Sequence, residues 1–506
     1  MSPGGSGPEQ LEEIFEYRFT RLDPVMGDHI DPPSVAVYET LLTKGADGKP
    51  RPGLAAAWTV SDDGMSWRLR LRDGARFHSG AICDAHLVVE ALELCRWADG
   101  LPRQVWYWDP VDSVRAVDDR TVEFRLLFPC ARLPVLLWGT HTAIVNPRTW
   151  RQLGSEFGAV TADGTGAYRL VEYSADSVIV ELAGISTALA LAGRPRRIRW
   201  RSMPDEAERV ASLEEPEVSA VRAVPLSRVT PDDPIWRFDT QAENSQFYLA
   251  LNFDAGFGDR GLRRALEAFI DREELADEAL EGRGDARRSP IPVADEFADS
   301  YVDSSDRALS HAEARAELAR LGFTPDDDGI AQRDGWRLEF ECVTQNTDPF
   351  RSLAAVVERQ LLRAGVRIHF TFHEPFADFY RAVEAGPPAF LSKWLWPDAM
   401  EAVMGFSRSD CIEPGGGNWQ HANTPAVDET YDRFLRAEAN DARAASALAQ
   451  RAFMAEMPYL PLCSPTETLA VRRDVLGFGL EPRTLYPSYE QVTFAGGSTG
   501  LMMGAT

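Results

Sequence analysis

The chain has 506 residues and is strongly acidic, with 53 Lys and Arg against 78 Asp and Glu and a formal net charge of −25. Its 44% hydrophobic and 26% charged residues are typical of a globular protein, long enough for about three domains with cores of their own. The sequence pI near 4.8 argues against a nucleic-acid partner and against docking on anionic lipid, which need clustered Lys and Arg. No run of about 18 apolar residues occurs, so the sequence predicts no transmembrane helix.

Cysteines and the first residues say little about the compartment. The six cysteines are sparse, and none stands closer than 12 residues to the next, so neither a disulfide framework nor a structural zinc site is expected. The first eight residues carry neither the basic nor the apolar stretch of a signal segment. Either the chain acts in the cytoplasm, or a signal segment was removed from the sequence.

Short strands dominate the region from about 60 to 129. Apolar Trp67, Leu69 and Leu71 alternate with arginines, and Val122 and Phe124 alternate with charged residues in the same way. This period of two predicts half-buried strands, and Asp- and Gly-rich turns separate them.

The clearest pattern lies in the second half of the chain. Apolar positions between 262 and 270 mark one face of a helix, and Ser310 with Glu313 predicts a capping box that opens another. The elements that follow are a strand at 338–342, a helix at about 349–364, a strand at 366–372, a helix at 376–383 and an extended run at 389–394. This β-α-β-α-β order predicts a parallel sheet, which binds ligands beyond the carboxyl ends of its strands. Those ends are 344–346 and 394–396.

Motifs for catalysis and metal binding are incomplete. The chain has no P-loop and no Gly-x-Ser-x-Gly elbow, and His373-Glu374 lacks the second histidine of a zincin motif. Residues 326–329 (Asp-Asp-Asp-Gly) lack the spacing of a calcium loop and favour a hairpin turn before a strand at Trp336. We therefore expect no enzymatic activity, no metal and no cofactor.

Short motifs follow one another in a specific order along most of the chain, from about 22 to 478. They lie at 22–24 (Leu-Asp-Pro), 38–42, 52–55, 61–64, 71–80 (Leu-Arg-Asp-Gly-Ala-Arg-Phe-His-Ser-Gly), 164–168 (Gly-Thr-Gly-Ala-Tyr), 251–252, 262–266, 270–272, 290–292 and 458–462 (Pro-Tyr-Leu-Pro-Leu). Each motif alone is weak, but the ordered set is strong. The chain thus resembles solute-binding protein family 5, the dipeptide-, oligopeptide- and nickel-type binding proteins of ABC transporters.

The resemblance implies an α/β protein with the type II periplasmic-binding-protein fold, two lobes around a ligand cleft and an extra strand-rich subdomain in lobe one. The implied parts are lobe one at 1–45, its inserted subdomain at 46–164, its second part at 165–252, lobe two at 253–474 and a return to lobe one at 475–506. It implies a monomeric, extracytoplasmic protein that captures a small solute and delivers it to an ABC permease in the membrane. The alternative is a cytoplasmic solute sensor or regulatory protein on the same fold.

One departure from the family concerns the ligand. The family pattern Ala-Asp-Tyr-Pro-Asp-Pro reads Trp-Leu-Trp-Pro-Asp-Ala at 394–399. In peptide-binding members the first aspartate of that pattern holds the ammonium group of the ligand, and here Leu395 stands in its place. We therefore expect a solute other than an ordinary peptide with a free N-terminus, unless a loop bend brings Asp398 into that role.

The candidate ligand contacts are aromatic or polar residues near the expected cleft, together with Leu395. They are Trp394, Trp396, Leu395, Asp398, Trp419, Asn418, Trp106, Trp108, Asn346 and His141. Trp394 and Trp396 share one side-chain parity and form either a platform for the ligand or part of the core. Residues 106–108 form either a cleft wall or a surface hairpin that packs on itself. The loop at 415–419 resembles a ligand-side loop of the family, and His141 and Asp398 have structural alternatives.

Overall fold

The structure, a computed structural model, describes residues 10–26, 32–45, 47–97, 105–184, 194–300, 308–396, 398–412, 416–480 and 489–495. The chain divides into two compact units. Unit 1 comprises Met1–Leu101, Pro110–Gln241 and Glu467–Thr506, and unit 2 comprises Pro102–Asp109 and Ala242–Thr466. Segment 102–109 thus belongs to unit 2, although the chain on both sides of it belongs to unit 1. The predicted lobe boundaries remain a proposal.

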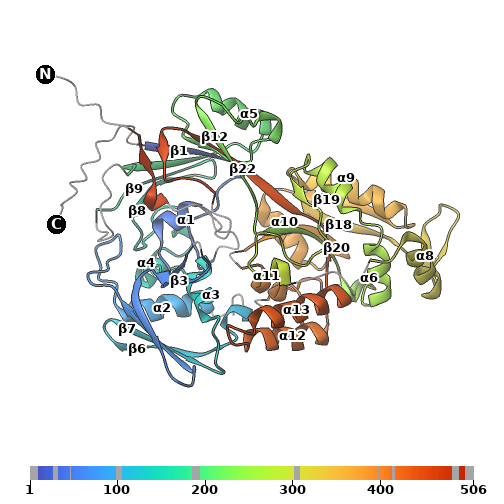
Figure 1. The fold of residues 1–506 in the computed structure, drawn as a ribbon, viewed down its shortest axis with the longest axis horizontal. Coiled ribbons are helices and arrows are strands. Elements are labelled where there is room, and N and C mark those ends of the chain that lie inside the picture. Colours follow the sequence, from blue (N-terminus) through green and yellow to red (C-terminus); the bar gives the residue numbers. More distant parts are fainter. Residues whose placement is uncertain are drawn as a thin grey trace. The chain divides into compact units, whose positions relative to one another are not determined.

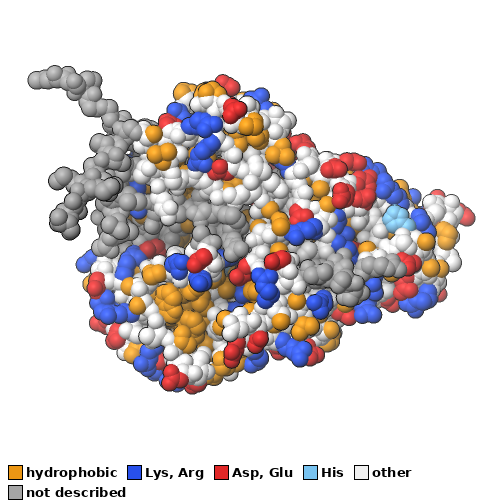
Figure 2. Space-filling view, in the orientation of Figure 1, with side chains coloured by type: hydrophobic (Ala, Val, Ile, Leu, Met, Phe, Trp, Pro, Cys, Tyr) orange, Lys and Arg blue, Asp and Glu red, His pale blue; other side chains and the backbone are white. Residues whose placement is uncertain are grey.

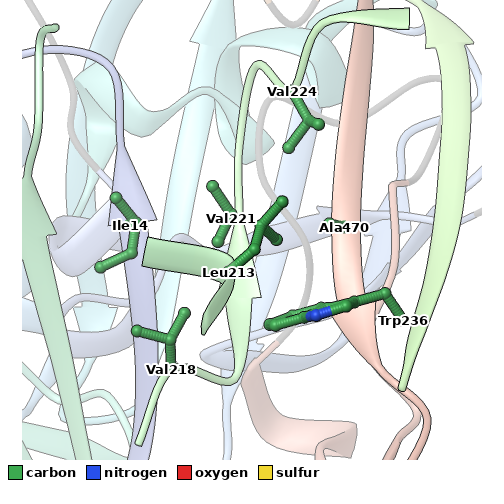
Figure 3. Packing of buried hydrophobic residues seen from close by; sticks show 7 residues of the cluster. All are labelled: Ile14, Leu213, Val218, Val221, Val224, Trp236 and Ala470. Atoms are coloured by element: carbon green, nitrogen blue, oxygen red, sulfur yellow. The ribbon is translucent and has the colours of Figure 1, made fainter. Parts of the chain in front are cut away.

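A mixed sheet forms the centre of unit 1 (Figure 1). Its strand order is β12 (Trp236–Ala242), β22 (Ser464–Arg472), β11 (Ala220–Val221), β1 (Gln10–Phe15), β10 (Arg197–Ser202), β9 (Ser177–Leu182) and β8 (Tyr168–Tyr173). Strand β1 pairs in parallel with β10 and β11, whereas β10, β9 and β8 pair in antiparallel fashion. Apolar side chains from distant parts of the sequence pack on this sheet (Figure 3): Ile14, Leu213, Val218, Val221, Val224, Trp236 and Ala470.

Unit 1 also contains short helices, a second, antiparallel sheet, and a pair of short strands, β23 (Val475–Leu476) and β24 (Thr493–Phe494). The helices are α1 (Pro32–Val37), α2 (Ala85–Arg96), α3 (Leu133–Trp138), α4 (Pro147–Leu153) and α5 (Glu206–Ala211). The second sheet has the order β4 (Ala55–Val60), β5 (Ser66–Leu71), β7 (Thr121–Leu126) and β6 (Val111–Asp118), and β2 (Leu42–Lys44) pairs with β3 (Pro50–Pro52). The predicted alternation in β5 is confirmed, because Trp67, Leu69 and Leu71 are buried and the arginines between them are exposed.

Glu123 breaks this alternation in β7. It points to the charged face of the sheet, yet its side chain is only 2% exposed because three arginines from β5, β6 and β7 cover it. Its carboxylate lies 2.8 Å from Arg68 Nε, 2.5 Å from Arg115 Nη2 and 3.2 Å from Arg125 Nε. Burial raises the pKa of Glu123, but the three guanidinium hydrogen bonds outweigh it and lower the pKa to about 2.

We predict that Glu123→Gln lowers the free energy of unfolding by about 2 kcal/mol at neutral pH, because charge-assisted hydrogen bonds to a covered group are lost. Since the folded-state pKa lies below the ordinary value, this contribution is present above pH 4.5 and disappears as the pH falls towards 2. Urea denaturation at several pH values measures the difference. Glu90→Gln, which removes an exposed ion pair with Arg151, is the matched control and should cost less than about 1 kcal/mol. Equal losses in both variants would contradict the prediction.

The sheet of unit 2 contains the predicted parallel strands. Its order is β19 (Arg367–His373), β18 (Glu339–Gln345), β20 (Ala389–Leu395), β13 (Ser245–Leu251) and β21 (Leu460–Pro461). Helices α9 (Phe350–Leu362) and α10 (Phe376–Glu384) connect β18 to β19 and β19 to β20, and β18 pairs in parallel with both strands. The predicted β-α-β-α-β order is therefore confirmed. The alternation predicted for β19 fails at Phe372, which is 40% exposed, because β19 is the edge strand of this sheet.

Helices and a small sheet surround this core. The helices are α6 (Arg260–Glu267), α7 (Arg272–Glu274), α8 (His311–Arg320), α11 (Ala399–Gly405), α12 (Pro425–Leu435) and α13 (Ala442–Glu456), the last two side by side in Figure 1. The capping box of Ser310 and Glu313 is confirmed at the start of α8. Residues 326–329 form the predicted turn, between β15 (Thr324–Pro325) and β16 (Ala331–Arg333), with β17 (Trp336–Arg337) beyond.

The described parts of the chain contain no helix that is long and apolar enough to cross a membrane. Figure 2 shows acidic and basic side chains interspersed over the face that it presents. The acidic balance is therefore distributed on this face and is not gathered into one large patch.

Candidate functional site

The carboxyl ends of β18 and β20 are offset along the sheet. Val343 pairs with Phe390, so β20 runs about three residues, or roughly 10 Å, past the end of β18 at Gln345. The end of β20 pairs with β13 instead, where Gln246 lies opposite Trp394 and Ser245 opposite Leu395. The predicted segments 344–346 and 394–396 therefore end at different levels and do not pair with each other.

The indole of Trp396 lies at the centre of an aromatic cluster in unit 2. Its ring centroid is 6.0 Å from that of Trp106, 5.9 Å from that of Tyr107 and 5.9 Å from that of Phe406. Its Nε1–H donates to the Tyr107 hydroxyl. Trp396 is 7% exposed and Trp394 is 2% exposed. Both side chains are thus buried, in agreement with the prediction that they lie on one face of the strand. Their contact with a ligand remains a prediction.

Residues 105–108 form a buried 3₁₀ turn, η2 (Val105–Trp108), that packs against α11. Trp106 and Trp108 are 3% and 6% exposed, so the interpretation as a surface hairpin is wrong. The aromatic side chains belong to unit 2, whereas the strand that follows them belongs to unit 1. Gly405 of α11 makes the close packing possible, because a Cβ at this position would lie 2.3 Å from Cε2 of Trp106.

An ion pair also anchors this segment in unit 2. Arg408, which is 6% exposed, contacts the carboxylates of Asp109 and Asp410, and its guanidinium lies 4.7 Å from the ring centroid of Tyr431. Burial raises the pKa of Asp109 to about 6, although Arg408 acts in the opposite direction. The Tyr431 hydroxyl donates to Glu401 at 3.0 Å, which connects α12 to α11.

We predict that Gly405→Ala destabilises unit 2, although alanine favours a helix by about 1 kcal/mol over glycine, because the new methyl group meets the Trp106 indole. The penalty should largely disappear in a Trp106→Leu background, and a double-mutant cycle by thermal denaturation measures it. Gly258→Ala is the control, since its Cβ would have no neighbour closer than 3.6 Å. Additive effects of the Gly405 and Trp106 variants would contradict this packing.

The partly exposed face at the end of β20 is that of Leu395 and Lys393. Lys393 Nζ lies 3.2 Å from Glu243 Oε2, which also accepts a 2.7 Å hydrogen bond from Ser245 Oγ. The carbonyl of Leu391 points towards β18, where it accepts from the Thr344 hydroxyl at 2.9 Å. Main-chain groups of every second residue point to the same side of a strand. The amide and carbonyl of Leu395, four residues after Leu391, therefore point to the same side as the Leu391 carbonyl, at a level beyond the end of β18.

Asp398 caps the N-terminus of α11. Its side chain accepts a 3.1 Å hydrogen bond from the Glu401 amide, and Asp398 is only 1% exposed. The adjacent Ala399 amide donates to Asp295 at 3.1 Å. The buried carboxylate of Asp398 therefore satisfies the start of a helix, in agreement with its structural alternative.

Asn418 and Trp419 differ in exposure. Asn418 is fully buried, and its Nδ2 donates to the carbonyls of Arg408 and Ala422 at 2.8 Å each, so its side chain holds the loop together. Trp419 is partly exposed, and its ring centroid lies 5.7 Å from that of Phe406, at the edge of the aromatic cluster. Gly415 of the predicted loop lies outside the described residues. A ligand contact by Asn418 or Trp419 remains a prediction.

Asn346 and His141 belong to other parts of the chain than the aromatic cluster, and His141 belongs to the other unit. Asn346 follows β18, partly exposed, and its amide donates to the carbonyl of His373 at 2.8 Å. His141 belongs to unit 1 and is 8% exposed, and burial lowers its pKa to about 3, so the imidazole is neutral at physiological pH. The ligand roles of Asn346 and His141 remain predictions.

Sequence reasoning missed two amides beside the predicted tryptophans. Gln246 lies directly opposite Trp394, and Asn244 exchanges hydrogen bonds with the main chain of Trp396. Their proximity depends on the pairing of β13 with β20, which are more than 130 residues apart in the chain. The local sequence offers no signal for this pairing beyond the apolar pattern of each strand.

Metal ligands do not gather in the described parts of the chain, where no group of three or more His, Cys, Asp or Glu could hold an ion. All six cysteines are buried with free thiols. Burial raises the pKa of Cys95 to about 12, which keeps that thiol protonated and unreactive.

The sequence of the chain matches a known protein family and two relatives over most of its length. The family model for bacterial extracellular solute-binding proteins, family 5 (middle), matches residues 49–411. The chain is 27% identical to protein XP55 of Streptomyces lividans over 492 residues, which cover 92% of this chain and 85% of that protein. It is 25% identical to the glutathione-binding protein GsiB of Salmonella typhimurium over 487 residues, with coverage of 92% and 91%.

Solved structures of similar fold include two binding proteins with different ligands. The oligopeptide-binding protein AppA from Bacillus subtilis, in complex with a nonapeptide, gives a TM-score of 0.82 at 18% identity over 96% of this chain and 99% of that one. NikZ from Campylobacter jejuni, in complex with Ni(L-His), gives 0.80 at 19% identity over 96% and 100%. These matches confirm the predicted type II periplasmic-binding-protein fold.

Proposed function

The chain belongs to the bacterial extracellular solute-binding proteins of family 5, and from this premise we propose that it is the substrate-binding component of a peptide/nickel-type ABC importer. It captures a small solute outside the cytoplasm and delivers it, as a monomer, to a membrane permease. The observation that carries the proposal is the family match over residues 49–411, which include parts of both units. The proposal includes no catalytic step, cofactor or nucleic acid. The alternative of a cytoplasmic sensor gains no support from the comparisons.

A solute that binds only the folded chain should raise its melting temperature. We therefore expect at least one fraction of a mixed pool of peptides, amino-acid derivatives and metal–amino-acid complexes to raise the melting temperature by several degrees. Unchanged melting in every fraction, together with no small molecule retained on the protein, would contradict solute binding.

The end of β20 indicates the class of solute. Leu395 offers no charge where peptide-binding relatives carry an aspartate, Asp398 caps a helix, and Glu243 is paired with Lys393. An ammonium group withdrawn from water without a counter-charge costs several kcal/mol. We infer that the solute presents an apolar or neutral part to Leu395.

The main chain of Leu395 supports a peptide-like solute without that ammonium group. Its amide and carbonyl point beyond the end of β18, where an extended segment could pair with them as an added strand does. Main-chain pairing gives affinity for an amide backbone whatever its side chains. An N-blocked peptide or an amide-containing amino-acid derivative therefore fits this strand end better than a free peptide.

We predict that Leu395→Asp improves binding of the free tripeptide Ala-Phe-Ala by at least about tenfold, because a carboxylate near the peptide amine restores a charge-assisted hydrogen bond. Leu395→Asn keeps a similar shape without the charge and should give no such gain. Isothermal titration calorimetry of both variants and the unmodified chain, with N-acetyl-Ala-Phe-Ala alongside, measures the effect.

Glutathione, the solute named for the GsiB relatives, has a free ammonium group and belongs in the same titration series. Tight binding of free peptides by the unmodified chain, lost on acetylation, would show that another residue holds the amine. The proposed role of Leu395 would then be wrong.

A further inference from the structure

Four side chains share one face at the end of the β13–β20 ladder. Gln246 lies directly opposite Trp394. One step beyond, the Trp396 amide donates to the Asn244 carbonyl at 3.5 Å, and Asn244 Nδ2 donates to the Trp396 carbonyl at 3.1 Å. Because side chains alternate along strands, two amides and two indoles form a compact group on the face opposite to that of Leu395.

Hydrogen bonds fix the orientation of both amides. Gln246 Nε2 donates to the carbonyl of Ser289 at 2.8 Å, just as Asn244 Nδ2 donates to that of Trp396. Since each nitrogen faces a carbonyl, the atoms left over are oxygens, which act only as acceptors. Neither Asn244 Oδ1 nor Gln246 Oε1 has a hydrogen-bond partner among the described residues.

Both amides are well buried, with Gln246 1% exposed and Asn244 7% exposed. A buried acceptor without a donor destabilises the folded state, and such acceptors also occur elsewhere in the described chain, at Gln420 Oε1 and Gln450 Oε1. Here two occur on neighbouring steps of one ladder, beside two buried indoles at the end of the strand that carries Leu395. A hydrogen-bond donor of a solute placed here would satisfy an acceptor that the folded chain leaves without a partner.

We propose that Asn244 and Gln246 form a subsite that accepts a neutral hydrogen-bond donor of the solute, such as a carboxamide N–H or a hydroxyl, with an apolar group of the solute beside the indoles. The subsite deepens the proposed function and rests on it. In this subsite, the uncharged oxygens Asn244 Oδ1 and Gln246 Oε1 accept hydrogen bonds from the solute.

Carboxylates near the end of the β13–β20 ladder accept from other groups of the protein, and Glu243 shares the face of Leu395, not that of the two amides. Glu243 is bound by Lys393 and Ser245, and Asp295 and Asp398 accept from the first turn of α11. An ammonium group at the amide oxygens would therefore lack a dedicated counter-charge, whereas a carboxamide or hydroxyl needs none. The subsite thus agrees with the apolar residue at position 395.

The test uses the full chain and two matched pools of probes. One pool holds the N-acetyl amides of Ala, Val, Leu, Ile, Met and Phe, and the other holds the N-acetyl-N-methyl dimethylamides of the same amino acids, which carry no N–H donor. After equilibrium dialysis, mass spectrometry should find at least about tenfold more of the best-retained amide than of its dimethylamide, since a buried acceptor left unpaired disfavours the second pool.

A pair of variants separates the subsite from general stability. Gln246→Met should reduce retention of the best amide by at least about fivefold. Gln450→Met is the matched control, because Gln450 is also fully buried with an unpartnered Oε1 but lies in α13. It should change retention by less than about twofold, even if both variants melt at a lower temperature.

Equal retention of the two pools, retention of neither, or an equal effect of the two variants would overturn the subsite. The selectivity between pools needs no variant, so it decides the question even if Gln246→Met does not fold. Failure of the subsite alone leaves intact the melting shift expected from the broad solute pool, whereas failure of solute binding abolishes that shift as well.

Discussion

The packing of Trp396 among Trp106, Tyr107 and Phe406 is the interaction on which the candidate site depends. It holds segment 105–109 in unit 2 and fixes the end of β20 against α11. Once the indole of Trp396 is buried on one face, Leu395 must turn to the other, and Trp394 must share the buried face. The Trp396 amide donates to the Asn244 carbonyl, and the Asn244 side chain donates to the Trp396 carbonyl, so the pairing of β13 with β20 continues past the end of β18. The site therefore follows from aromatic burial combined with strand alternation.

Carboxylates around this strand end serve the fold. Asp398 and Asp295 satisfy the first amides of α11, Asp109 pairs with Arg408, and Glu243 pairs with Lys393. Each of these carboxylates therefore already accepts from a group of the protein itself. Leu395 replaces the aspartate of the family pattern, and the proposed subsite offers uncharged acceptors. We infer the neutral solute class from this lack of a free negative charge.

Features set by short-range patterns could be predicted from the sequence. The β-α-β-α-β order, the Ser310 capping box and the alternation of Trp67, Leu69 and Leu71 each depend on residues near in sequence, and all are confirmed. The motifs at matching spacing indicated the family, which the family model confirms, whereas the role of position 395 stays a prediction.

Features set by distant partners could not be predicted. Residues 105–108 pack against α11 because of Gly405, almost 300 residues away, and Gln246 meets Trp394 only through strand pairing. The offset between the ends of β18 and β20 depends on which residues of the two strands pair. The alternation of apolar and polar residues within each strand does not specify this pairing. A glutamate in an alternating strand is expected on the exposed face. Glu123 is buried there only because arginines from three strands cover it, which the local sequence does not show. In each case the deciding contact is absent from the local sequence.

A crystal structure of the chain with its solute bound is the most direct test of solute recognition at the end of β20. We expect an apolar part of the solute against Leu395, and a neutral N–H or O–H of the solute within hydrogen-bond distance of Asn244 Oδ1 or Gln246 Oε1. A solute that does not touch residues 393–396, or a solute ammonium group bound there by a carboxylate, would contradict it.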